Sequence, residues 1–248
     1  MLLRNPIDRN QKLDSSLATR YLWISWRISG VYPPKKYRTA YYIYAVISNL
    51  IAVLLPISTI TNIFFIKGLQ LMVENLSLTV TVVTATIKHF ILYLYQDHLL
   101  QTNIYLKKLD KRSNEHPRDR YHVLFAIRIC HIFYLVYNIL FTVAAYGFAV
   151  IGVRTHQLLF NGWYPDFFND ETKNYHAAFI FQFLAITIYV FQNTNNDMYP
   201  QCYVAIMIGH LRALIERIER IGKDDRVSDE DNLDELLACI QDHKNILK

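Results

Sequence analysis

Four long blocks of apolar residues constrain this chain more than any other feature of its sequence. They cover about residues 41–66, 69–95, 123–152 and 176–208. The first block has 26 residues and no charge; as helix it measures roughly 39 Å at ~1.5 Å per residue, enough to cross a hydrocarbon core about 30 Å thick. Core helices of water-soluble proteins rarely run so far without a polar face. The pattern predicts an all-α fold, a polytopic membrane helix bundle with four transmembrane spans and cytoplasmic helical extensions.

The composition agrees with a membrane protein. Hydrophobic residues make up 52% of the chain and charged residues 19%, whereas soluble domains hold roughly 25% charged residues. The mean hydropathy of +0.11 excludes general disorder. The three cysteines, Cys130, Cys202 and Cys239, form neither a disulfide framework nor a zinc-binding spacing. The first block is not a signal peptide, because it begins 40 residues into the chain and is too long.

The distribution of Lys and Arg predicts the orientation. The N-terminal segment, the connection 97–122 and the segment after residue 210 together hold 21 of these residues, and the connections on the opposite side hold three. Cytoplasmic segments are enriched in Lys and Arg. We therefore expect a multi-pass plasma-membrane protein with its N-terminus in the cytoplasm. Its expected parts are a cytoplasmic or interfacial segment 1–38, a four-span bundle 39–210 and a cytoplasmic helical tail 211–248.

Several segments outside the apolar blocks also have interpretable patterns. Residues 13–38 predict an amphipathic helix, which we place at the membrane interface; an ordinary cytoplasmic helix is the alternative. Residues 97–122 predict a helix on each side of a turn at 114–117. The connection 153–175 carries an aromatic cluster that either caps a pocket or forms an interfacial belt; its members are Trp163, Tyr164, Phe167 and Phe168, with Pro165.

The tail is expected to form two helices. An apolar stripe from Leu211 to Ile221 ends at Gly222, and Ser228 with Asp231 resembles a capping box that starts a second helix. The stripes of the two helices either pack on each other or pack on something outside this sequence.

Polar residues inside the spans are candidates for function by default. Glu74 lies near the outer end of span two and either faces the interface or faces a ligand. The stretch 192–197, which includes Asn193, Asn195, Asn196 and Asp197, is expected to mark the point where span four reaches the inner surface. A functional polar site there is the alternative.

No pattern of catalytic residues is present. The nine histidines include no pair at helical spacing for a metal, and the sequence contains no G-x-S-x-G, P-loop or Cys-x-x-Cys motif. We predict that the chain is not an enzyme and that it needs no cofactor or metal. No basic stripe interleaved with aromatic residues indicates nucleic-acid binding.

Three short motifs, in order, carry a family resemblance. They are WRISGVYPP at residues 26–34, FNGWYPD at 160–166 followed by Tyr175 and Gln182, and LACIQDHKNIL at 237–247. In these motifs, their spacing and the expected cytoplasmic N-terminus, the chain resembles the insect odorant receptors over essentially its whole length. The resemblance implies an odorant-gated, non-selective cation channel subunit that assembles with a shared co-receptor subunit into a hetero-oligomer in the lipid bilayer.

The resemblance also implies what this sequence lacks and where a ligand binds. Odorant receptors have seven spans, so we expect a chain truncated after the fourth, without the pore span and without one wall of the odorant pocket, and we expect no odour-evoked current from it. A volatile apolar odorant needs chiefly shape and apolar surface. The ligand-binding residues expected at the outer ends of spans two to four are Met72, Val73, Leu76, Tyr146, Val150, Phe179 and Phe183. The alternatives are a gustatory-type receptor fragment and an unrelated four-span structural or adaptor protein.

Overall fold

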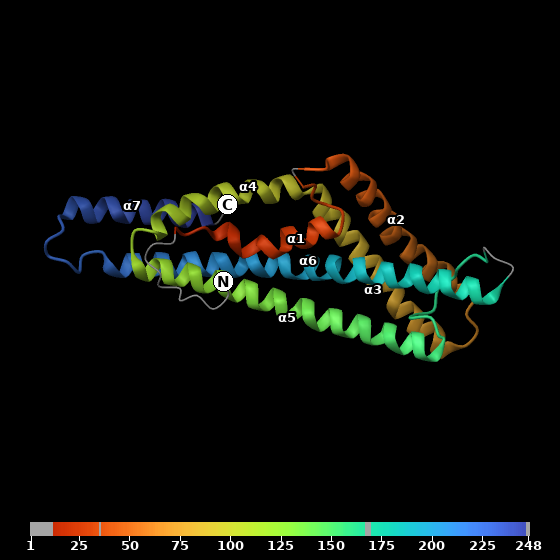
Figure 1. Cartoon of the computed structure of the whole chain (residues 1–248). Helices are drawn as coiled ribbons and strands as arrows, with labels where there is room; N and C mark the ends of the chain where they lie inside the picture. The colour runs from red at the N-terminus through yellow and green to blue at the C-terminus, as the bar shows by residue number, and fades with distance from the viewer. Residues whose placement is uncertain (1–11, 35, 167–169, 247–248) are drawn as a thin grey trace. The chain divides into compact units, whose positions relative to one another are not determined.

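The computed structural model describes residues 12–34, 36–166 and 170–246, so Phe167 and Phe168 of the aromatic cluster lie outside the described residues (Figure 1). A short 3-10 helix, η1 (Ser15–Thr19), is followed by seven α-helices: α1 (Arg20–Ile28), α2 (Arg38–Ile63), α3 (Leu69–Leu94), α4 (Gln96–Ser113), α5 (Pro117–Thr155), α6 (Glu171–Arg220) and α7 (Asp229–Ile246). The described residues include no strand, so the all-α prediction is confirmed. Helices α2, α3, α5 and α6 are long and apolar enough to span a membrane, which confirms the four predicted spans.

The helix ends in the polar segments have local causes. Pro117 is the first residue of α5, a position where the missing N–H costs nothing, and it follows the predicted turn. Gly222 adopts a φ of +73° just after α6, which a residue with a Cβ rarely adopts. The Ser228 hydroxyl accepts a hydrogen bond from the Asp231 N–H at 3.1 Å and so caps α7. The turn, the stop and the cap are as predicted.

Contacts divide the chain into two compact units. Unit 1 consists of the residues up to Tyr21, Tyr95–Tyr134 and the residues from Met198 onward; unit 2 consists of Leu22–Leu94 and Leu135–Asp197. Unit 2 therefore holds α2, α3 and the parts of α5 and α6 next to the loop that joins them. Unit 1 holds η1, α4, α7 and the other parts of α5 and α6.

The core of unit 2 joins α2, α3 and α6. Its buried members are Leu55, Val82, Ala85, Ala185 and Tyr189. The Tyr189 hydroxyl hydrogen-bonds the Thr86 hydroxyl at 3.0 Å and donates to the Val82 carbonyl. A phenol in an apolar bundle needs such partners, because an unpaired polar group there costs several kcal/mol.

The polar stretch of α6 lies inside unit 2. The helix neither ends nor unwinds there, and the side chains of Gln192, Thr194 and Asn195 are fully buried. Helix α1 packs beside this stretch: the Ser25 hydroxyl donates to the Phe191 carbonyl at 3.3 Å, and Trp26 is buried. Burial in protein therefore adds to the expected explanation, which was only that span four reaches the membrane surface.

Asp197 ends that stretch with two polar partners. It pairs with Lys88 at 3.4 Å and accepts a hydrogen bond from the Tyr137 hydroxyl at 3.1 Å. The three residues come from α3, α5 and α6. Their contacts link three of the four long helices within unit 2.

The apolar core of unit 1 answers the question left open for the tail. Leu109, Leu214, Cys239 and Ile246 are buried together, with Leu211 and Ile221 against them. Parts of the α6 and α7 stripes therefore meet, with α4 contributing Leu109. The other stripe residues stay exposed: Ile215, Ile218, Leu233, Leu236, Leu237 and Ile240.

The close approach of α5 and α6 in unit 1 gives a first prediction. A Cβ on Gly209 would lie 2.9 Å from the Ala126 Cβ and 3.2 Å from the His122 carbonyl oxygen. We expect Gly209→Ala to lower the melting temperature of the purified protein, because overpacking costs ~1–3 kcal/mol. Gly147→Ala is the control, since nothing lies within 4 Å of its added Cβ. Equal melting temperatures for both variants would contradict the close packing.

Candidate functional site

A shallow hollow between α5 and α6 in unit 2 is the first candidate site. Its volume is about 310 Å³, and it is lined by Tyr146, Ala149, Val150, Val153, Arg154, Phe179 and Phe183. The rings of Tyr146 and Phe183 form its floor contact, with centroids 5.6 Å apart and planes tilted by 31°. Apart from the Arg154 side chain and the Tyr146 hydroxyl, the lining is apolar, which suits a small uncharged molecule.

The structure brings together four of the seven residues predicted for ligand binding. Tyr146, Val150, Phe179 and Phe183 line the hollow. The other three predicted residues lie on α3 and do not line it; Met72, Val73 and Leu76 have exposed fractions of 43%, 58% and 47%. A ligand role for all seven residues stays a prediction. The sequence analysis did not include Ala149, Val153 and Arg154, although the same helical spacing points to Ala149 and Val153.

The loop between α5 and α6 is fixed by three polar side chains from the long helices. Gln182, which is fully buried, accepts from the Leu159 N–H at 2.7 Å and donates to the Phe160 carbonyl at 2.8 Å. The Asn75 amide donates to the Asn161 carbonyl at 3.0 Å. The Ser58 hydroxyl donates to the Trp163 carbonyl at 2.8 Å, and the Ser58 carbonyl accepts from the Trp163 N–H at 3.1 Å.

These contacts give the loop a defined shape in unit 2. Gln182 also donates to the Tyr164 hydroxyl at 2.6 Å. Burial raises the pKa of Tyr164, although its hydrogen bonds to Gln182 and Ser58 oppose that effect. The phenol therefore stays protonated at neutral pH. Polar residues in apolar helices were the available sequence signal for this arrangement, but only Gln182 was singled out.

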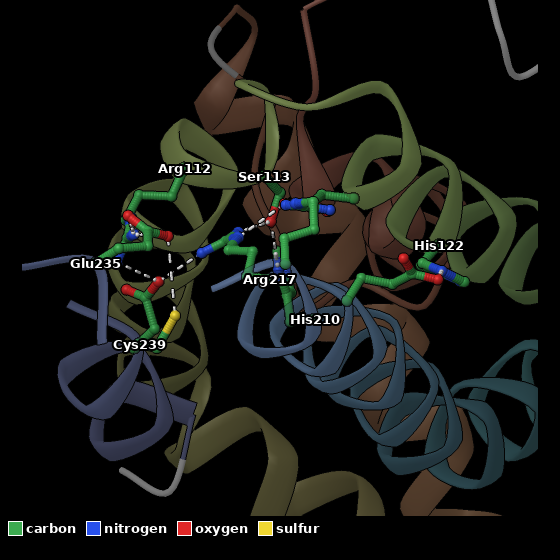
Figure 2. A network of polar contacts seen from close by, with 11 residues as sticks. Arg112, Ser113, His122, His210, Arg217, Glu235 and Cys239 are labelled. Atoms are coloured by element: carbon green, nitrogen blue, oxygen red, sulfur yellow. Dashed lines mark hydrogen bonds and ion pairs between the residues drawn. The ribbon is translucent and has the colours of Figure 1, made fainter. Parts of the chain in front are cut away.

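A second cluster of polar side chains lies in unit 1 (Figure 2). Arg217 is its centre, with 7% of its side chain exposed. Its guanidinium donates to Asp119 at 2.8 Å, to Asp242 at 2.7 Å and to the Ser113 hydroxyl at 3.0 Å. These partners come from α5, α7 and α4, so one side chain of α6 links four helices.

Two further arginines complete the charge balance of this cluster. Arg220 donates to both oxygens of Asp119, at 2.9 and 3.0 Å. Arg112 donates to Asp242 at 3.0 Å and to Glu235 at 2.7 and 2.8 Å. Each buried carboxylate therefore has two cationic partners. A buried ion pair is stable only when hydrogen bonds replace the lost water in this way.

The 3-10 helix η1 joins the cluster through Ser15. Its N–H donates to Asp110 at 2.8 Å, and its hydroxyl also donates to that carboxylate and lies 3.0 Å from His210 Nε2. Burial raises the pKa of Asp110, and the hydrogen bonds from Ser15 counteract part of that effect. A raised pKa means that ionising Asp110 costs stability as the pH rises above the unfolded value of about 3.9, and that the cost disappears in acid.

The comparisons with known proteins agree with the resemblance in sequence. A family model described as 7tm Odorant receptor matches residues 68–248. Odorant receptor 2a of Drosophila melanogaster is 26% identical, with 93% of this chain and 62% of that receptor covered. For Odorant receptor 59b of the same species, the identity is 27% and the coverage is 99% and 63%. The chain belongs to the insect odorant receptor family.

A solved structure has the same fold as this odorant receptor chain. The insect olfactory receptor OR5 from Machilis hrabei matches with a TM-score of 0.61 and 15% identity, over 92% of this chain and 63% of that chain. The chain thus spans about three fifths of the length of the relatives it matches. Because the family is a receptor family, membership confirms that the chain is not an enzyme and excludes the alternative of an unrelated adaptor.

The buried arginine cluster of this odorant receptor chain gives a second prediction. Arg217→Ala leaves Asp119 and Asp242 each with one cation fewer in a buried site, and we expect a loss of ~3–5 kcal/mol in the free energy of unfolding. The measurement is a thermal unfolding curve of the purified protein in detergent.

The matched control is Arg226→Ala. Arg226 pairs only with Asp224 on the surface, and 89% of its side chain is exposed. Its loss should leave the unfolding curve unchanged, because exposed pairs contribute little. Similar curves for both variants would show that the Arg217 cluster does not stabilise the fold.

Proposed function

We propose that this chain is part of an odorant receptor subunit that binds volatile apolar molecules in the hollow between α5 and α6. The observation that carries the proposal is the hollow itself, because two residues of α5 and two of α6 that were chosen from sequence line it together. Its volume of about 310 Å³ falls at the lower end of the range for small-molecule sites. Aromatic and branched side chains supply shape and apolar surface, and the Tyr146 hydroxyl supplies one polar group.

The rest of the activity follows from family membership as a proposal. In the receptor that contains this sequence, ligand binding opens a non-selective cation channel formed with a co-receptor subunit. The protein works in the plasma membrane with its N-terminus in the cytoplasm. The surplus of Lys and Arg in the N-terminal segment, in 97–122 and after residue 210 supports this orientation.

Ligand binding in the hollow is testable by mutation. In the receptor that contains this sequence, expressed with a co-receptor, Tyr146→Ala and Phe183→Ala should change the rank order of odorants that evoke current, because each removes a ring from the lining. Each substitution should shift the half-maximal concentration of the best odorant by about tenfold or more, which corresponds to ~1.4 kcal/mol. Ile180→Ala is the control, since Ile180 is 59% exposed and does not line the hollow. Unchanged tuning in both ring variants would refute the site.

The orientation is testable with epitope tags. A tag placed before Met1 should react with antibody only after the cells are permeabilised, because the N-terminus is proposed to be cytoplasmic. A tag inserted between α5 and α6, after Asp166, should react on intact cells. Reaction of the N-terminal tag on intact cells would reverse the topology and move the hollow to the cytoplasmic side.

A further inference from the structure

Unit 2 contains a second cavity that is separate from the hollow between α5 and α6. Its volume is about 280 Å³, and it lies between α2, the α5–α6 loop and the first turns of α6. The residues that matter most for the argument are Leu54, Ile57, Trp163, Tyr164, Ala177 and Phe181. No residue lines both the cavity and the hollow.

The two sites use different faces of α6. Successive residues of an α-helix are rotated by about 100°. Ala177, Ala178 and Phe181 therefore share one face, whereas Phe179 and Phe183 share the opposite face. Helix α6 separates the cavity from the hollow, so a molecule in one does not touch the lining of the other.

The cavity has a fixed wall. Trp163 is held by its two backbone hydrogen bonds to Ser58, and Tyr164 is held by the hydrogen bond from Gln182. Both loop residues are thus tied to spanning helices that also line or flank the cavity. A wall that is already in place reduces the ordering cost that a ligand must meet.

The lining selects the chemistry of the ligand. The described lining residues include no charged side chain. The Ser58 hydroxyl donates to a backbone carbonyl, and the Tyr164 hydroxyl has its partner in Gln182. A charged or strongly polar molecule would lose its water without gaining partners, which is unfavourable. An uncharged apolar molecule meets rings and methyl groups instead.

The size and the opening narrow this further. An apolar cavity of about 150 Å³ holds one benzene molecule, so a cavity of about 280 Å³ has room for one ring with a short substituent. Leu54 and Ile57, on its α2 side, are 40% and 50% exposed. They lie on a helix apolar enough to span a membrane, and apolar side chains exposed there meet hydrocarbon. A molecule dissolved in the bilayer can therefore reach the cavity from the side.

We propose that this cavity is a second binding site, for an uncharged single-ring compound that enters from the bilayer between α2 and α6. It is distinct from the odorant site proposed above and does not depend on it. Trp163 forms part of its wall, which provides an optical signal for occupancy.

Bromobenzene is a suitable ligand for the test, because its heavy atom quenches tryptophan fluorescence on contact. The 248-residue chain in lipid nanodiscs is titrated with bromobenzene. We expect a saturable quenching component from Trp163 above a linear background from the other two tryptophans. Trp163→Phe should remove the saturable component. Toluene, which fits the same space but does not quench, should restore the fluorescence in a saturable manner.

Two matched substitutions locate the binding. Ala177→Phe fills this cavity and should weaken the saturable component by about tenfold or more, whereas Ala149→Phe fills the hollow and should leave it unchanged. The absence of a saturable component in the unmodified chain would overturn the proposal, as would its loss in Ala149→Phe with retention in Ala177→Phe. The toluene competition needs no substitution, so misfolding of a variant does not obscure the result. Odorant-evoked currents play no part in this readout, so the failure of one proposal is distinguishable from the failure of the other.

Discussion

The structure depends on one constraint: polar groups in apolar helices must find their partners within the protein. Hydroxyl side chains meet this need locally, as Thr86 does by donating to the Val82 carbonyl one turn earlier at 2.9 Å. Amide side chains meet it over longer distances. Asn196 donates to the Ala85 carbonyl of α3 at 3.0 Å, and Gln182 binds three groups of the α5–α6 loop. Because each amide bond joins segments far apart in the chain, these few side chains fix the register of helices whose apolar surfaces alone allow sliding.

The features that depend on local pattern were predictable. The number of spans follows from apolar length, the break between α4 and α5 follows from Pro117, and the end of α6 follows from Gly222. The length of α6 was not predictable in this way, because its 50 residues continue through a polar stretch that looks like the end of a span. The reason is tertiary: α1 packs beside that stretch, so its polar side chains are buried without a break in the helix.

The same division applies to the candidate sites. Tyr146 and Val150 are four residues apart, as are Phe179 and Phe183, so helical spacing alone places each pair on one face. That the two faces meet each other, and that Met72, Val73 and Leu76 do not join them, depends on how the helices pair. The Arg217 cluster is further from prediction, because Arg217 and Asp119 are separated by 98 positions in sequence and no local pattern links them.

Helix α6 gives unit 2 two separate apolar surfaces because its period is 3.6 residues and its faces have different neighbours. On one face, ring side chains oppose α5 and leave a shallow hollow. On the other, the small side chains of Ala177 and Ala178 leave space that α2 and the loop enclose. Gln182 fixes that loop by its hydrogen bonds to Phe160 and Tyr164. The shape of the second cavity therefore depends on a polar residue of α6, although its surface is almost entirely apolar. A leucine at position 182 would preserve the hydropathy of the span and remove the contacts that hold the wall.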